Sequence, residues 1–224
     1  MNTYIVVSSK PWNRHLSSRL QQRVGGKWLQ IKRKEEFVYK QLKKIEPKYI
    51  LIPHWSYIIP EKIFENFECI VFHMTDLPYG RGGSPLQNLI KEGHEQTQIS
   101  AIQVEKDLDA GDIYLKRPLS LLGTAEEIFI RADKVIEEMI VNIIEEDPEP
   151  KRQQGQVVTF SRRKPEDSRI KGITGLEELF DHIRMLDAEG YPNAFLETES
   201  FRLEFKRASL KTDKLLADVR IFQK

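Results

Sequence analysis

Cysteine is almost absent from this chain of 224 residues, because Cys69 is the only one. A disulfide within the chain is therefore excluded, which fits a reducing compartment, and we expect a cytoplasmic protein. Cys69 lies inside a short apolar run, so we interpret it as a small core residue rather than a nucleophile.

Long apolar runs and an excess of one charge are also lacking. No segment approaches the roughly 18 apolar residues of a membrane-spanning helix, and residues 1–7 lack the basic start of a secretion signal. The formal net charge is +1, with acids and bases interspersed. We therefore expect no membrane partner, and a nucleic-acid partner is not favoured.

Strand-like and helix-like segments alternate along the first 146 residues. Apolar, largely β-branched runs predict strands at 4–7, 28–31, 49–52, 70–73 and 98–104. Apolar residues at helical spacing predict helices at 16–24, 35–45, 84–91 and 125–143, the last opened by a capping box at Thr124 and Glu127. The alternation predicts an α/β, Rossmann-like fold with a mostly parallel sheet and helices on both faces.

Residues 147–155 are polar and contain two prolines, so we interpret them as a linker. It divides the chain into a large domain at residues 1–150 and a small C-terminal β-rich domain at 151–224. In the small domain the pattern predicts a helix near 176–186 and strands near 201–205 and 215–221.

Two polar segments follow predicted strands and carry the candidate chemistry. The first reads His73-Met74-Thr75-Asp76-Leu77-Pro78-Tyr79-Gly80-Arg81-Gly82-Gly83-Ser84-Pro85, and the second reads Leu108-Asp109-Ala110-Gly111. A histidine and an aspartate at the ends of neighbouring strands form a plausible general acid–base pair. Because open α/β sheets bind ligands at the carboxyl ends of their strands, we predict the site there.

These segments resemble the motifs of the formyltransferases that use 10-formyltetrahydrofolate, which include glycinamide ribonucleotide, methionyl-tRNA and amino-sugar enzymes. The family pattern runs Asn-x-His-x-Ser-Leu-Leu-Pro, Arg-Gly-x-x-Pro, Thr-Gly-x-Thr and Leu-Asp-x-Gly. The residues in step with it are His73, Thr75, Leu77, Pro78, Arg81, Gly82, Pro85, Thr97, Ser100, Leu108, Asp109 and Gly111. The resemblance implies an N-formyltransferase with 10-formyltetrahydrofolate as formyl donor and no metal.

The resemblance also implies roles for particular residues. His73 and Asp109 would be catalytic, with the aspartate orienting the imidazole and relaying protons through water. The folate would bind at Trp55, Ser56, Tyr57, Ile58, Ile59, Gly82, Gly83, Val104, Asp107 and Leu108. The amine substrate would bind at Ser8, Lys10, Asn13, Thr75, Asp76 and Arg81. Trp55 and Tyr57 could equally be core aromatics, and Asp76 could be a solvated loop acid.

One departure concerns the oxyanion of the tetrahedral intermediate. Val71 stands where the family has asparagine, and such a hydrogen-bond donor is typically worth about 2.7–4 kcal/mol. His54, Gln87, Asn88 or a backbone N–H after His73 could replace it. A catalytically silent folate-binding module is the alternative.

The acceptor amine is inferred from resemblance alone. The motif variant around residues 73–90 resembles the N-formyltransferase of the pseudaminic-acid pathway, which acts on a UDP-linked 4-amino-4,6-dideoxy-N-acetyl-altrosamine. We therefore expect folate and a nucleotide-linked amino sugar as partners. Methionyl-tRNA or an aminoacyl carrier is the alternative acceptor, disfavoured here because residues 151–224 are near neutral. A homodimer is left open.

Overall fold

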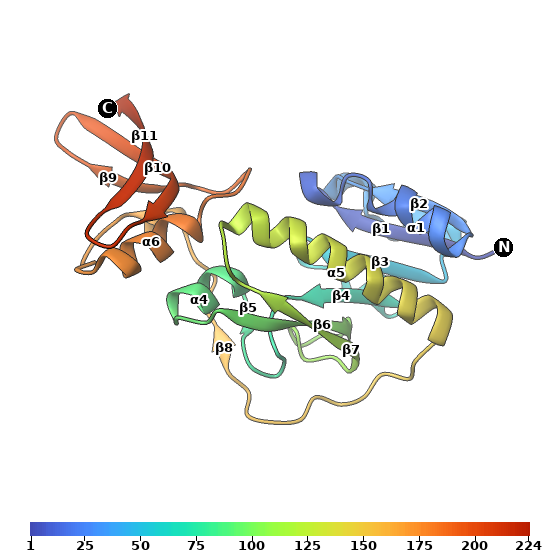
Figure 1. Ribbon diagram of the computed structural model, residues 1–224. Helices are drawn as coiled ribbons and strands as arrows, with labels where there is room; N and C mark the ends of the chain where they lie inside the picture. The colour runs from blue at the N-terminus through green and yellow to red at the C-terminus, as the bar shows by residue number, and fades with distance from the viewer. The chain divides into compact units, whose positions relative to one another are not determined.

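The computed structural model describes residues 1–224 and contains a six-stranded sheet in the order β2-β1-β3-β4-β6-β7 (Figure 1). Its strands are β1 (Thr3–Ser8), β2 (Lys27–Ile31), β3 (Tyr49–His54), β4 (Cys69–His73), β6 (Gln96–Gln103) and β7 (Ile113–Ser120). β1 pairs in parallel with β2 and β3, and β3 with β4, whereas β6 pairs antiparallel to β4. The predicted mostly parallel sheet is confirmed.

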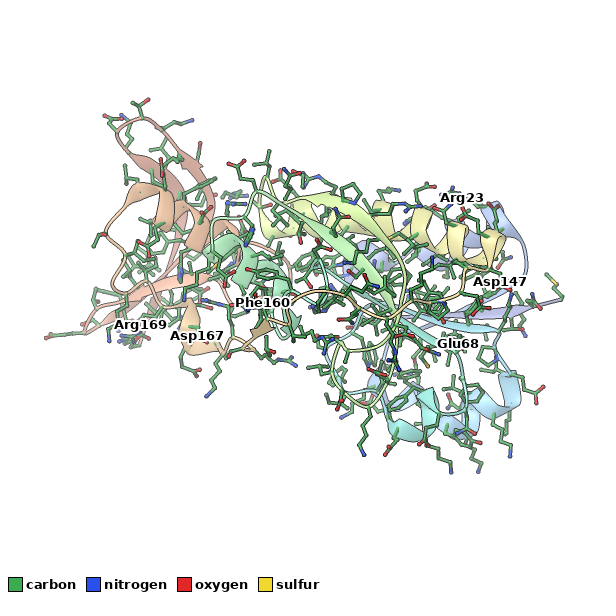
Figure 2. All side chains as sticks on the ribbon, turned by 90° about the horizontal axis from the view of Figure 1, so that it is seen from below. Arg23, Glu68, Asp147, Phe160, Asp167 and Arg169 are labelled. Carbon is green, nitrogen blue, oxygen red and sulfur yellow. The ribbon has the colours of Figure 1, made fainter.

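Six α-helices accompany the strands: α1 (Leu16–Val24), α2 (Tyr39–Ile45), α3 (Glu61–Phe64), α4 (Pro85–Lys91), α5 (Ala125–Glu146) and α6 (Leu176–Arg184). In Figure 2 the yellow helix α5 lies on one face of the six-stranded sheet and the blue and cyan helices α2 and α3 lie on the other. No helix is both long and apolar enough to cross a membrane.

The second predicted helix, at 35–45, is only partly right. Lys34–Glu36 forms a 3₁₀ turn, and α2 begins only at Tyr39. Val38 between them is extended, with φ −126° and ψ 139°, and Phe37 is buried in the core. The β-branched Val38 favours the extended backbone, which interrupts the helix directly after the buried Phe37 ring.

An apolar core lies between the sheet and helices α2 and α3. Its fully buried members include Ile5, Ile50, Leu42, Ile63 and Cys69. Cys69 is 1% exposed, and burial followed by the nearby Glu68 carboxylate raises the pKa of its thiol to about 12. The interpretation of Cys69 as a core residue is therefore confirmed.

The chain divides into two compact units, and the division differs from the predicted boundary near residue 150. The first unit comprises Met1–Gly82, Thr97–Leu119 and Ile130–Thr159, and the second comprises Gly83–Gln96, Ser120–Phe129 and Phe160–Lys224. The predicted linker belongs to the first unit because its backbone is hydrogen-bonded there. Lys151 exchanges two backbone hydrogen bonds with Ile113, at 2.8 and 2.9 Å.

The second unit contains a three-stranded antiparallel sheet in the order β11-β10-β9, with α6 packed against β10. Its strands are β9 (Ala194–Glu197), β10 (Phe201–Leu210) and β11 (Leu215–Gln223), which confirms the predicted small β-rich module and adds β9. Arg169, labelled in Figure 2, pairs with Glu197 of β9. The remaining short strands are β5 (Arg81–Gly82) and β8 (Thr159–Phe160).

Candidate active site

The predicted acid–base pair is brought together at the end of β4, the strand that His73 terminates. His73 Nε2 lies 2.8 Å from the carbonyl oxygen of Gly80, to which it donates, and His73 Nδ1 lies 3.6 Å from Asp109 Oδ2. The two side chains are 7% and 11% exposed. The imidazole is therefore fixed on one edge by the backbone and faces a carboxylate on the other.

Asp109 reaches His73 by a route that the strand pattern did not predict. β6 is antiparallel to β4, and its last residue, Gln103, lies opposite Ile70 rather than His73. The expectation that His73 and Asp109 follow the carboxyl ends of two parallel strands was therefore wrong. The loop 104–112 doubles back, and Gln103 N–H donates to Asp112 O at 2.9 Å. Its return requires Gly111, where an added Cβ would lie 1.9 Å from Gln103 O.

The segment that follows His73 is held by buried hydrogen bonds. Thr75 Oγ1 donates to Gly80 O at 3.3 Å, and Ser100 Oγ donates to the backbone carbonyl of Thr75 at 2.8 Å. Thr75, predicted as a substrate contact, is fully buried and therefore supports the loop from within. The Asp76 carboxylate remains 60% exposed and pairs with the Lys116 ammonium at 2.5 Å.

Arg81, also predicted to bind substrate, is held by a residue that sequence reasoning missed. Its Nε and Nη2 donate to Gln153 Oε1 at 3.1 and 2.8 Å. Gln153 lies in the segment 147–155, which was interpreted as a linker from its polar composition and its two prolines. No sequence pattern distinguishes it from its neighbour Gln154.

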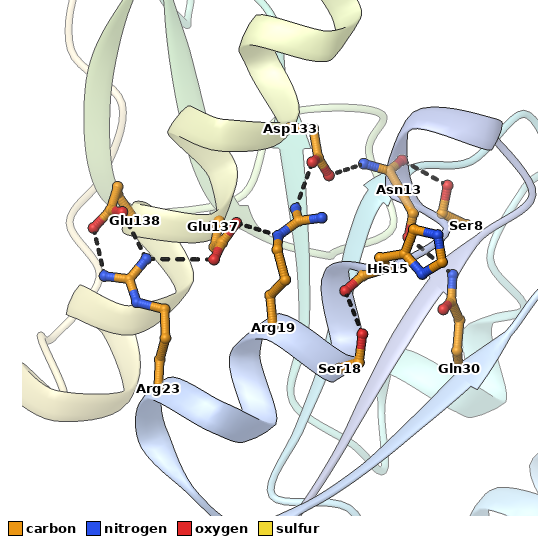
Figure 3. Close-up of polar contacts among 10 residues, drawn as sticks. All are labelled: Ser8, Asn13, His15, Ser18, Arg19, Arg23, Gln30, Asp133, Glu137 and Glu138. Carbon is orange, nitrogen blue, oxygen red and sulfur yellow. Dashed lines mark hydrogen bonds and ion pairs between the residues drawn. The ribbon is translucent and has the colours of Figure 1, made fainter.

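The loop after β1 is organised by an internal polar network (Figure 3). Ser8 Oγ donates to Asn13 Oδ1 at 2.8 Å, and Asn13 Nδ2 donates to Asp133 Oδ1 at 2.7 Å. Arg19 in turn donates to Asp133 and to Glu137 of α5. Ser8 and Asn13 are each 1% exposed. These two predicted substrate ligands therefore have structural roles, because their polar atoms are committed to the network.

Lys10, Trp12 and His54 gather at the ends of β1 and β3. Lys10 Nζ lies 5.6 Å from the Trp12 ring, whose centroid is 5.3 Å from that of His54. Burial lowers the pKa of Lys10, while burial and then the Lys10 charge lower the pKa of His54 to about 3. His54 is therefore neutral at physiological pH.

The predicted folate segments divide into core and exposed residues. Trp55 packs on Phe37 and on Tyr57, with ring centroids 5.9 and 5.2 Å apart, and Ile59 and Val104 pack against the core. Ser56 and Asp107 are exposed, as are the apolar side chains of Tyr57, Ile58 and Leu108, at 48%, 81% and 60%. The exposed side chains and the loop backbone are therefore the parts of these segments most open to a ligand.

The two predicted folate-binding glycines differ in what requires them. Gly82 has φ +106°, and its N–H donates to Asp109 Oδ2 at 2.9 Å. A Cβ on Gly83 would lie 2.5 Å from Arg162 Cβ, so the packing of Arg162 already accounts for glycine there. Gly82 belongs to the His73–Asp109 site, and Gly83 serves packing within the second unit.

No side-chain donor stands at the family's asparagine position. Val71 packs against the apolar core. Of the candidate replacements, Gln87 donates its amide to Met185 O, and Asn88 donates to Gly83 O and Ser161 O. Because those amides are already committed, His54 and a backbone N–H remain as the candidates.

A histidine and an aspartate placed side by side at the end of a strand in an open α/β sheet are suited to general acid–base chemistry. Comparison with known sequences makes the class specific. Residues 6–143 match the formyl transferase family, and residues 165–222 match the C-terminal domain of methionyl-tRNA formyltransferase. The chain therefore belongs to the formyl transferase family, which confirms the predicted family and enzyme class.

Several relatives and solved structures resemble this chain. The structure of a methionyl-tRNA formyltransferase from Clostridium thermocellum is 50% identical, with a TM-score of 0.97 and 100% of both chains covered. The methionyl-tRNA formyltransferase of Bacillus thuringiensis is 30% identical over 71% of this chain. A sugar N-formyltransferase from Shewanella is 12% identical, with a TM-score of 0.70 over 95% of this chain and 100% of that one. The chain spans 53–59% of the length of the first curated relatives.

These findings overturn the expected nucleotide-sugar acceptor. The sugar enzyme shares the fold at 12% identity, whereas the chain that is 50% identical throughout is a methionyl-tRNA enzyme. The net charge of +1 does not exclude a nucleic-acid partner either. Net charge is a sum over the whole surface, and a sum near zero does not exclude a local basic face.

Proposed function

We propose that this protein transfers the formyl group of 10-formyltetrahydrofolate to the amino group of methionyl-tRNA. The observation that carries the proposal is the 50% identity, over the full length of both chains, to the Clostridium thermocellum methionyl-tRNA formyltransferase. A tRNA substrate would place the reaction in the cytoplasm, the compartment expected from the lone cysteine.

The donor supplies a formyl carbon that the free amine attacks, forming a tetrahedral intermediate. When the bond to folate N10 breaks, the amine has lost one proton and N10 has gained one. Exposed Ile58 and Leu108, together with the backbone of their loops, are suited to an aromatic pterin. Arg81, held in fixed orientation by Gln153, would supply a cation for a phosphate or carboxylate.

His73 and Asp109 are placed to handle that proton. With Nε2–H donated to Gly80 O, Nδ1 is the ring nitrogen that faces the Asp109 carboxylate. A proton taken up by Nδ1 would lie between the ring and the carboxylate, where the negative charge stabilises it. The 3.6 Å separation exceeds a direct hydrogen bond, and such contacts commonly tighten when substrate binds.

A second candidate, a silent folate-binding module, is favoured by one observation. Val71 removes the side-chain donor that the family places two residues before the histidine. The two candidates are separated by turnover, because both bind folate but only an enzyme releases tetrahydrofolate.

The experiment is to incubate the purified protein with 10-formyltetrahydrofolate and methionyl-tRNA, and to measure tetrahydrofolate release and formylmethionine in acid-precipitated tRNA. Uncharged tRNA and free methionine serve as acceptor controls. We expect turnover with methionyl-tRNA alone, abolished in His73→Ala. Folate binding with no turnover would favour the silent module, and turnover with free methionine would refute tRNA as the required acceptor.

A further inference from the structure

The polar segment 151–158 crosses the first unit as a strap rather than a linker. At one end Lys151 pairs through its backbone with Ile113. At the other end Val158 O accepts hydrogen bonds from the N–H groups of Gly80 and Arg81, at 2.9 and 3.0 Å. The strap therefore joins the strand after the Asp109 loop to the loop that contacts His73.

Gln153 lies between these anchors, and its side-chain amide is fully used. Its Nε2 donates to the backbone carbonyls of Asp109 and Gly111, at 2.8 and 2.9 Å. Its Oε1 accepts the two hydrogen bonds from Arg81. One planar amide thus holds both the turn that carries Asp109 and the guanidinium of Arg81.

Asp109 has φ +54°, a left-handed conformation that few residues other than glycine, asparagine and aspartate adopt. The two hydrogen bonds from Gln153 Nε2 hold the backbone carbonyls of Asp109 and Gly111, the residues before and after Ala110. The Asp109 carboxylate then accepts Gly82 N–H and faces His73. Gln153 therefore holds the backbone that carries this carboxylate without touching the carboxylate itself.

We propose that Gln153 is a positioning residue for formyl transfer, acting on Asp109 through the turn that carries it. The inference rests on the proposed function. Only glutamine or asparagine offers a donor pair and an acceptor on one uncharged group. Loss of the amide would free the turn to leave its left-handed conformation and displace the carboxylate from His73, which reduces turnover rather than substrate affinity.

The test compares Gln153→Ala and Gln153→Glu with Gln154→Ala, the matched control at an exposed neighbour. Because a misplacement of about 1 Å can cost roughly a hundredfold in rate, we expect kcat of Gln153→Ala to fall by about that factor with KM values little changed. Gln153→Glu keeps an acceptor for Arg81 but has no donor for the two carbonyls, so its kcat should fall as far. Gln154→Ala should retain wild-type kcat.

A double variant distinguishes positioning from general destabilisation. If Gln153 acts through Asp109, Gln153→Ala should not further reduce the kcat of Asp109→Asn, because the group being positioned is already lost. Multiplicative losses in the double variant would overturn the proposal, as would wild-type kcat in Gln153→Glu.

A readout that needs no activity separates this inference from the proposed function. Hydrogen exchange of residues 104–112 should accelerate in Gln153→Ala and stay unchanged in Gln154→Ala. If the wild-type protein fails to formylate methionyl-tRNA, the proposed function fails. Accelerated exchange in Gln153→Ala would still show that Gln153 stabilises the Asp109 turn. Unchanged exchange would overturn the role proposed for Gln153.

Discussion

The network behind the first loop predicts that Asp133→Ala is strongly destabilising (Figure 3). Asp133 is 3% exposed, pairs with Arg19 at 2.5 Å and accepts the Asn13 amide at 2.7 Å. Burial raises the pKa of its carboxyl, against the lowering effects of Asn13 and Arg19. The group is thus a desolvated carboxylate, and its removal would take a partner from the buried Asn13 amide and one of two carboxylates from Arg19.

The magnitude follows from those partners. Removing one member of a buried ion pair costs about 3–5 kcal/mol. Arg19 is 26% exposed and keeps Glu137 at 2.6 Å, which favours the low end. The buried Asn13 amide would lose a partner, which costs about 1–3 kcal/mol. We expect a loss of about 3 kcal/mol, and a smaller loss for Asp133→Asn, which keeps an acceptor for Asn13.

The assay is urea unfolding followed by circular dichroism at neutral pH. With a slope of about 2–3 kcal/mol per molar urea, the Asp133→Ala midpoint should fall by about 1–1.5 M. Glu138→Ala is the control, because Glu138 is 62% exposed in its pair with Arg23, and such surface pairs contribute about 0–1 kcal/mol. Equal midpoints for Asp133→Ala and Glu138→Ala would refute the reasoning.

Three further predictions concern the site and its loops. His73→Ala and Asp109→Asn should each reduce kcat by roughly 10²–10⁴-fold, as measured by tetrahydrofolate release, while circular dichroism spectra stay unchanged; wild-type rates in either would remove the pair from the mechanism. His54, with its pKa lowered to about 3, should bind a proton on unfolding below its unfolded pKa of about 6.5, so stability should fall as pH decreases from 6.5 towards 3. The fall between pH 6.5 and 5 should be shallower in His54→Asn, and identical slopes would contradict the buried neutral state. Gly111→Ala would place a Cβ 1.9 Å from Gln103 O, and should cost about 1–3 kcal/mol in urea unfolding together with turnover; unchanged stability and rate would show that the loop can shift at no cost.

The sequence pattern predicted elements where the hydrophobic period was long and uninterrupted. The capping box at Thr124 opens α5 as predicted, with Thr124 N–H donating to Glu127 Oε2 at 2.7 Å and Glu127 N–H donating to Thr124 Oγ1 at 3.3 Å. The pattern failed at 35–38, because a buried Phe37 and an extended Val38 interrupt an otherwise helical spacing. The spacing of apolar residues does not predict which of them is buried in the core when the helix is interrupted.

The sequence by itself also indicated the family and the two catalytic candidates, because the motif residues and their spacing can be read directly along the chain. Direction of strand pairing, by contrast, was decided only by the tertiary structure: β6 runs antiparallel, and a returning loop brings Asp109 to His73. The same holds for Gln153, whose polar segment has a linker's composition but closes four hydrogen bonds within the site. Composition records what a side chain can bond, whereas its partners depend on long-range contacts that no local pattern encodes.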